Sequence, residues 1–220
     1  LYMTVDEMLD QFEIYLQQGM MGVKMKVGHA DPEIDIDRVV EVRRRLGPKV
    51  WIAVDANQQW TYEKALIAGR AFEQQGIAWL EEPLLCEDIE GHARLADKLD
   101  IPIALGETLA SRHEFATYLG ANAVDVLQPD VIRAGGITEC VKVIGMADVA
   151  GRSVAPHHMM EVSIQFVCGA MRAGPIEYMP WIARAFAEPS RIENGRMLPP
   201  TKPGLGLRIP EDTIQRYKVA

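Results

Sequence analysis

Short apolar runs rich in β-branched residues alternate along this chain with longer amphipathic stretches, at intervals of about two dozen residues. The apolar runs predict seven strands, at residues 22–28, 50–57, 78–83, 101–107, 124–130, 152–158 and 175–179. The amphipathic stretches predict helices between them, for example at residues 5–18, 34–46, 62–75 and 136–150. Strict alternation of strand and helix with short loops indicates a parallel sheet whose strands are joined by crossover helices.

The first predicted strand distinguishes between two parallel architectures, an open doubly wound sheet and a closed (β/α)8 barrel. Within residues 22–28, alternation sends Lys24 and Lys26 to one face and three apolar side chains to the other. An open sheet covered by helices has no suitable place for two ammonium groups, because unpaired buried charges are very costly. A barrel places polar groups at the C-terminal ends of its strands. The predicted fold class is therefore α/β, a TIM-type (β/α) barrel.

The strand count suggests a barrel that lacks its first strand. Residues 1–180 carry seven predicted strands, the chain opens with a predicted helix, and Leu1 stands where a complete protein has methionine. We therefore expect an upstream segment that supplies the first strand. Residues 181–220 lose the strand-helix alternation and are rich in proline, which predicts a C-terminal tail that leaves the barrel.

Composition narrows the classes of function. The 220 residues are 48% hydrophobic and 25% charged, as in soluble globular proteins, and a formal net charge of -8 excludes a general attraction to nucleic acid or to anionic membranes. No apolar run approaches the length of about 20 residues that spans a bilayer, and no export leader is recognisable. Cys86, Cys140 and Cys168 lack the spacing of zinc sites and favour a reducing, cytoplasmic compartment.

Three acidic residues close three consecutive predicted strands. Asp55, Glu81 and Glu107 follow one another at an equal spacing of 26 residues, so parallel strands in register would bring them together at the barrel mouth. Clustered carboxylates repel one another unless a divalent cation neutralises them, and oxygen ligands favour magnesium or manganese. Any one of them alone would be interpreted as a solvated residue at a strand end. The repeated spacing of all three predicts a metal site.

The two lysines of the first strand are candidates for proton transfer. Paired lysines on an edge strand are often simply solvated, but here helices must cover the apolar face, so the lysines point into the barrel. Like-charge repulsion is then expected to move Lys26 toward a neutral amine that can act as a base. Lys24 is expected to stay charged and to attract a substrate anion.

Polar residues at the ends of other strands complete the predicted site. Asp130 and His157 end consecutive strands, and a carboxylate beside an imidazole fixes the tautomer and raises the basicity of the ring. Glu177 faces the same mouth and, if kept protonated, could donate a hydrogen bond to an enolate oxygen. Asn57 suits a hydrogen bond to substrate or to a metal-bound water. His158 is expected to point to the opposite face from His157 by alternation.

The order of the short motifs resembles one enzyme family. The strings VKMKVG, VDANQQW, LEEPL, LGET, QPDVIRAGGIT, APHHMME and IEYMPW are similar to the mandelate racemase subgroup of the enolase superfamily, over nearly the whole chain. The resemblance implies a modified (β/α) barrel beneath an N-terminal α+β capping domain. This sequence lacks that domain and the first barrel strand. Residues 181–220 are accordingly expected to pack on the capping domain.

The resemblance also implies roles for individual residues. Magnesium is expected on Asp55, Glu81 and Glu107. Lys26 is expected to act as the base on one face of the substrate, and His157 on the other.

The remaining site residues take supporting roles in the same resemblance. Asp130 is expected to hold the catalytic histidine, Glu177 to be the electrophilic partner of the enolate, and Lys24 and Asn57 to contact the substrate carboxylate and the metal shell. A small-molecule carboxylate is the expected substrate. The expected protein partners are the capping domain and further copies in a homo-oligomer.

Two reactions share this machinery. Abstraction of the α-proton of a carboxylate can lead to dehydration of a sugar acid (an aldarate or aldonate) to a 2-keto-3-deoxy acid, or to racemisation or epimerisation of a 2-hydroxy acid. The motifs look most similar to the acid-sugar dehydratases of the galactarate/talarate type, which favours a lyase over an isomerase. A non-catalytic barrel fragment is the alternative from a different class, because the missing strand leaves sheet edges unpaired.

Overall fold

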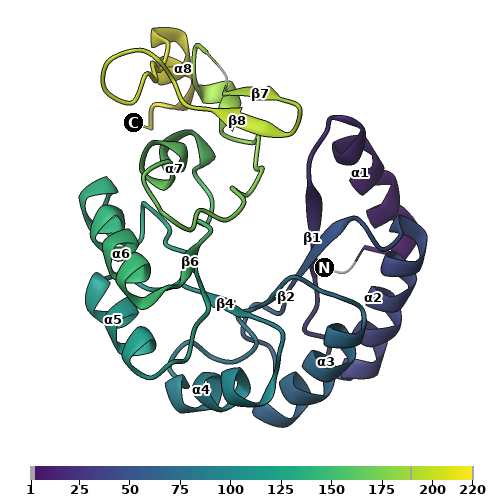
Figure 1. The fold of residues 1–220 in the computed structure, drawn as a ribbon. Coiled ribbons are helices and arrows are strands. Elements are labelled where there is room, and N and C mark those ends of the chain that lie inside the picture. Colours follow the sequence, from purple (N-terminus) through teal and green to yellow (C-terminus); the bar gives the residue numbers. More distant parts are fainter. Residues whose placement is uncertain (1–2, 189, 220) are drawn as a thin grey trace.

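A computed structural model describes residues 3–188 and 190–219, and a curved parallel sheet forms its centre (Figure 1). Six strands pair in sequence order, each parallel to the next. They are β1 Gly22–Lys26, β2 Trp51–Asp55, β3 Leu80–Glu81, β4 Ile103–Leu105, β5 Val126–Leu127 and β6 Ser153–Val154. The predicted α/β class with a parallel sheet is confirmed.

Helices connect the strands and lie outside the arc that the sheet forms (Figure 1). They are α1 Val5–Gln17, α2 Pro32–Leu46, α3 Tyr62–Gln74, α4 Ile89–Lys98, α5 Arg112–Gly120, α6 Ile137–Ala150 and α7 Met160–Val167. Local sequence fixes their ends: Thr4 and Glu7 form a capping box at α1, and Asp31 caps α2 ahead of Pro32. Among the described residues, no helix has the length and apolar character that crossing a bilayer requires.

Alternation along the strands separates two apolar layers. Ile52 and Val54 of β2 belong to the large cluster between the sheet and the helices. Ala53 lies on the opposite face in a small inner cluster, whose other members are Trp51, Trp79, Ala104, Val126 and Ala155. The rings of the two tryptophans meet edge to face with their centroids 4.7 Å apart. Apolar side chains therefore fill the inside of the arc below the strand ends, which leaves the mouth to polar groups.

The predicted seventh strand at residues 175–179 is wrong. Ala173 makes an isolated parallel bridge to Val154 of β6, and Gly174 donates a backbone hydrogen bond to the Val154 carbonyl at 2.7 Å. The pairing stops there because Pro175 has no N–H to continue a ladder. Residues 175–179 beyond it form no regular secondary structure.

The C-terminal part of the chain contacts the turn after α1. It contains the short helix η1 Ala183–Ala185, the antiparallel hairpin β7 Arg191–Glu193 with β8 Arg196–Leu198, and α8 Glu211–Tyr217 (Figure 1). Asn194 and Gly195 form the hairpin turn at φ of 50° and 71°. A Cβ on Gly195 would lie 1.8 Å from the carbonyl oxygen of Gly19. Packing of the tail on a capping domain stays a prediction, but its hairpin already rests on the α1–β1 turn.

The segment before the tail reaches the same side of the arc. The rings of Tyr178 and Tyr15 of α1 meet edge to face at 5.7 Å. Residues that follow the last paired strand therefore lie against the first helix, and the two ends of the arc are joined by side chains.

Candidate metal and proton-transfer site

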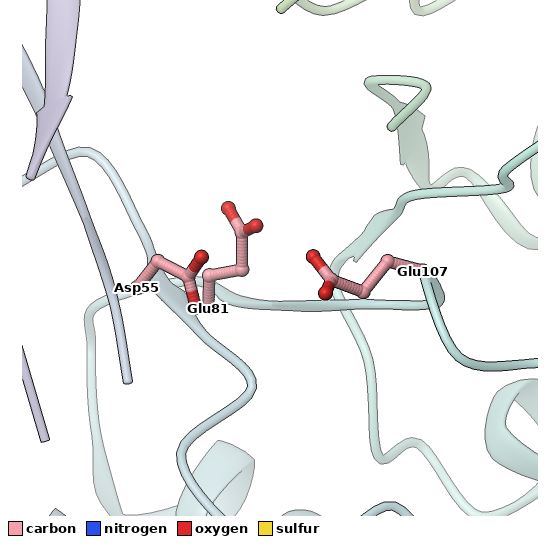
Figure 2. A group of neighbouring side chains, drawn as sticks. All are labelled: Asp55, Glu81 and Glu107. Atoms are coloured by element: carbon pink, nitrogen blue, oxygen red, sulfur yellow. The ribbon is translucent and has the colours of Figure 1, made fainter. Parts of the chain in front are cut away.

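Three carboxylates converge at the C-terminal ends of neighbouring strands. Asp55 ends β2, Glu81 ends β3, and Glu107 follows β4 by two residues. One oxygen of each lies within 4.8 Å of the others, and Asp55 and Glu81 are buried. Figure 2 shows the three side chains turned toward a common space. The spacing in the sequence is equal because the strand-helix units between these residues have the same length, and each unit places the next strand beside the previous one.

Lys24 sits among acidic side chains inside the arc. Its Nζ lies 2.5 Å from Glu81 Oε1, 2.7 Å from Glu177 Oε1 and 3.8 Å from Asp55 Oδ2. Burial lowers the pKa of Lys24, but the three carboxylates outweigh burial and hold its pKa above the ordinary value. This direction favours a charged ammonium at Lys24, and its attraction for a substrate anion stays a prediction.

Lys26 ends β1 at the rim of the site, and its side chain is 56% exposed. Its Cα partner across the sheet is Asp55, with which its Nζ forms an ion pair. The expectation that repulsion from Lys24 makes this amine neutral stays a prediction, since each lysine is paired with carboxylates here.

A buried ion pair fixes the turn that follows Lys26. Asp35 of α2 is fully buried and accepts hydrogen bonds from the backbone N–H of Gly28 at 2.7 Å and of His29 at 2.6 Å. Arg38 pairs with Asp35 at 2.6 Å and donates to the Lys26 carbonyl at 3.1 Å. The backbone of the proposed base is thereby tied to the helix behind it.

His157 and Asp130 form the expected pair on the far side of the carboxylates. The imidazole Nδ1 lies 2.8 Å from Asp130 Oδ2, so Nε2 faces Glu107 Oε2 at 3.5 Å. Burial lowers the pKa of His157, but the bond to Asp130 and the charges of Glu107 and Glu177 raise it above the ordinary value. Burial raises the pKa of Asp130, yet hydrogen bonds from His157 and from backbone amides such as that of Ile132 bring it below its usual range.

Glu177 lies beside the Lys24 ammonium, and the expectation of a protonated Glu177 stays a prediction. Burial raises the pKa of Glu177, but the ammonium of Lys24 outweighs burial and holds the pKa below its usual range. Its other oxygen accepts a hydrogen bond from the His158 backbone at 3.2 Å. The His158 ring does not lie opposite His157: the two centroids are 5.7 Å apart, because φ of 50° at His158 turns the chain out of the strand.

The residues after Asp55 and Glu81 are held by hydrogen bonds at the barrel mouth. Asn57 has a φ of 42°, so strand alternation does not extend to it, and its backbone N–H donates to Asp55 Oδ1 at 2.9 Å. A contact of its side chain with substrate stays a prediction. Buried Glu82 accepts from Gln58 Nε2 at 3.0 Å and from Thr108 Oγ1 at 3.1 Å. Burial raises the pKa of Glu82.

Two residues in contact with Glu81 were missed in the sequence. Trp79 Nε1 donates to Glu81 Oε2 at 2.9 Å, and the Gln128 side chain lies close enough to this carboxylate to be among the groups that lower its pKa against burial. Both carry a detectable signal, since Trp79 lies two positions before Glu81 and Gln128 two before Asp130 on the same strand faces.

The donor set fits a hard divalent cation. All three converging groups offer carboxylate oxygen, and the fully buried pair of Asp55 and Glu81 would leave two negative charges in a region of low dielectric. The lysines offset part of this charge. The set contains no cysteine or histidine ligand, which argues against zinc.

Comparisons with known proteins agree with this arrangement. Residues 7–213 match the family model described as enolase C-terminal domain-like. An L-talarate/galactarate dehydratase of Salmonella typhimurium is 40% identical over 211 residues, covering 96% of this chain and 53% of the relative.

Two solved structures have the same fold. The L-talarate dehydratase of Polaromonas sp. JS666, complexed with Mg and L-glucarate, is 39% identical with a TM-score of 0.94 over 98% of this chain and 60% of that one. A racemase of Streptomyces coelicolor with bound magnesium is 29% identical with a TM-score of 0.94, over 99% and 60%. The chain spans less than two thirds of each relative. With its fold, strand-end carboxylates and motifs all in agreement, the chain belongs to the enolase C-terminal domain-like family.

Proposed function

We propose that the protein containing this chain is a magnesium-dependent lyase that dehydrates a sugar acid, an aldarate or aldonate, to a 2-keto-3-deoxy acid. One observation supports this most directly: three converging carboxylates lie between a lysine pair and a histidine–aspartate pair. The dehydratases of Salmonella and Polaromonas among the relatives support the choice of reaction.

Asp55, Glu81 and Glu107 are the residues proposed to hold magnesium. Bound there, magnesium supplies positive charge that stabilises the negative charge developing on the substrate carboxylate as the α-proton leaves. Lys24 adds a fixed positive charge beside the same place. Its position among Glu81 and Glu177 leaves it preorganised to attract a carboxylate.

Lys26 and His157 are proposed to move protons on the two sides of the substrate. Lys26 Nζ takes the α-proton, and the electron pair of the C–H bond enters the enediolate. His157 carries its exchangeable proton on Nε2, because Nδ1 is engaged by Asp130. Its raised pKa favours the protonated imidazole that gives a proton to the departing β-hydroxyl, which leaves as water.

Racemisation or epimerisation is the second candidate, and the magnesium-bound racemase of Streptomyces coelicolor favours it. In that reaction the enediolate is reprotonated from the opposite side and no hydroxyl leaves. The arrangement of Lys26 and His157 serves either outcome.

The complete protein is proposed to contain more than this chain. The relatives are longer, which supports an upstream segment with a capping domain and the first barrel strand, with residues 181–220 packing on that domain. We further propose a homo-oligomer in the cytoplasm. All three cysteines are free thiols, which suits a reducing compartment.

Incubating the full-length protein and magnesium with a panel of aldarates and aldonates tests the reaction. We expect a 2-keto product from at least one of them. Exchange of the α-proton with solvent deuterium without a keto product would assign the racemase reaction instead. Absence of both reactions across the panel, in protein that binds magnesium, would contradict the proposal.

Variants separate the proposed roles. Lys26→Met and His157→Asn are expected to lower turnover by at least about a hundredfold, since each removes a proton-transfer group. Both should still bind magnesium, whereas Asp55→Asn should lose magnesium binding and turnover together. Calorimetric titration of magnesium provides the check, and loss of metal in His157→Asn would show that its role is misassigned.

A further inference from the structure

Gln128 occupies a position inside the arc that the proposed chemistry does not use. It follows β5 directly and is 3% exposed, and its backbone N–H donates to the Leu105 carbonyl at 2.9 Å. Because Leu105 pairs with Leu127, the residue opposite Gln128 is Gly106, directly after β4. Alternation puts the Gln128 side chain on the inner face, below Asp130.

A small residue of β4 leaves room for this side chain beside the carboxylates. Ala104 is the β4 partner of Glu81, and it places only a methyl group on the inner face between Glu81 and Gln128. A Cβ on Gly106 would meet the Gln128 backbone nitrogen at 3.0 Å. Burial raises the pKa of Glu81, and the nearby Gln128 side chain is among the groups that lower it, while the two Glu81 oxygens accept from Lys24 and Trp79.

The other half of the same amide lacks a partner. Gln128 Oε1 is buried and accepts no hydrogen bond from the residues that the structure describes. Turning the amide over would set its oxygen against the Glu81 carboxylate, so the donor must face Glu81. An acceptor left unsatisfied in the interior costs about 1–3 kcal/mol, which points to a donor that binds there.

We propose that Gln128 contacts a ligand of the carboxylate site: Nε2 orients Glu81, and Oε1 accepts a hydrogen bond from a bound O–H group. That group is either a water of the metal shell or a hydroxyl of the substrate. A carbonyl oxygen can only accept, so an incoming carboxylate does not suit this position. The inference rests on the proposed function, because it assigns a further contact within the same site.

Two substitutions in the full-length protein test the donor and the acceptor of the Gln128 amide separately. Gln128→Met fills a similar volume without a strong donor or acceptor. Gln128→Glu keeps an acceptor but loses the donor to Glu81. Gln17→Met, on the exposed face of α1, is the matched control. Manganese affinity is measured without substrate, and kcat and KM are measured with a converted sugar acid and with its deoxy analogues.

Manganese affinity and KM together distinguish the two sources of the O–H group. If it is a metal-shell water, Gln128→Met weakens manganese binding about tenfold without substrate. If it is a substrate hydroxyl, Gln128→Met changes manganese affinity little and raises KM for the sugar acid about tenfold. The deoxy analogue that lacks this hydroxyl should then bind equally well to wild type and to Gln128→Met. Gln128→Glu should weaken manganese binding less than Gln128→Met if the water contact dominates.

The proposal fails if Gln128→Met binds manganese and processes every substrate as wild type and Gln17→Met do. It also fails if the variant loses only thermal stability, since a merely structural role would leave affinity and KM unchanged in the folded fraction. A wild-type protein that converts no sugar acid would count against the proposed function alone. The manganese titration would still test the Gln128 contact in that case. Unchanged manganese affinity in Gln128→Met would then contradict the contact.

Discussion

His92 on α4 ties the stability of the fold to pH. It is 1% exposed, its Nδ1 lies 2.8 Å from the Asp88 carbonyl, and its Nε2 has no partner among the described residues. Burial lowers the pKa of His92, so the unfolded chain binds a proton more readily than the folded one. The stability that the neutral ring contributes is present above the unfolded pKa of about 6.5 and is lost as pH falls toward the folded value.

Replacing His92 by Phe should remove this pH dependence while keeping the edge-to-face contact with Tyr118. Between pH 7.5 and 5.5, the wild-type free energy of unfolding should fall more than that of His92→Phe, by at most about 1.4 kcal/mol per pH unit. Urea unfolding at both values provides the measurement. Exposed His113→Phe serves as the control and should follow wild type; equal slopes in wild type and His92→Phe would contradict the assignment.

Residue types and spacing were enough to locate most of the site. Asp55, Glu81 and Glu107 could be found because strand ends recur at a fixed interval. The ion pair of Glu177 could not, since it depends on the 2.7 Å approach of Lys24 from a strand far away in the sequence. The missing partner of Gln128 is likewise a property of packing, which no sequence pattern records.

At the scale of elements, the β7–β8 hairpin depends on glycine where it meets the α1–β1 turn. Gly195→Ala should lower the free energy of unfolding by more than the cost of a left-handed alanine, about 1 kcal/mol, because its Cβ would collide with the Gly19 carbonyl. Gly204 has a similar φ of 69°, but the space that a Cβ would occupy there is open, with nothing within 4 Å. Gly204→Ala should therefore show the backbone cost alone.

Hydrogen exchange provides the structural check on these two variants. Gly195→Ala should speed exchange in α1 and in the hairpin, whereas Gly204→Ala should leave α1 as in wild type. Equal destabilisation by both would mean that the hairpin is not held against the turn.

The helices could be predicted closely, and the strands less so. Caps such as Thr4 and Asp31 mark helix ends in the sequence. Strand ladders stop earlier than their apolar runs, because the chain turns to positive φ at Asn57 and Glu82. The hairpin of the tail was not predicted, since its strands are short and partly exposed and carry little apolar pattern.

At the scale of the whole molecule, the outer edge of β1 decides how the chain behaves alone. Among the described residues, β1 Gly22–Lys26 pairs only with β2, so its other edge offers free backbone groups. Residues 1–220 produced by themselves should be inactive and should associate without a defined end point as concentration rises. Sedimentation velocity tests this against the full-length protein, which should form a discrete assembly. A monomeric, active 220-residue species would contradict it.

We expect the contact between Gly19 and Gly195 to form late in folding. Gly19 and Gly195 are in contact although they lie far apart in the sequence. Their contact closes a very long loop, and closing it costs a correspondingly large amount of chain entropy. Neighbouring strand-helix units can form from local contacts before that closure. During synthesis, α1 is therefore made well before the β7–β8 hairpin that covers the turn after it.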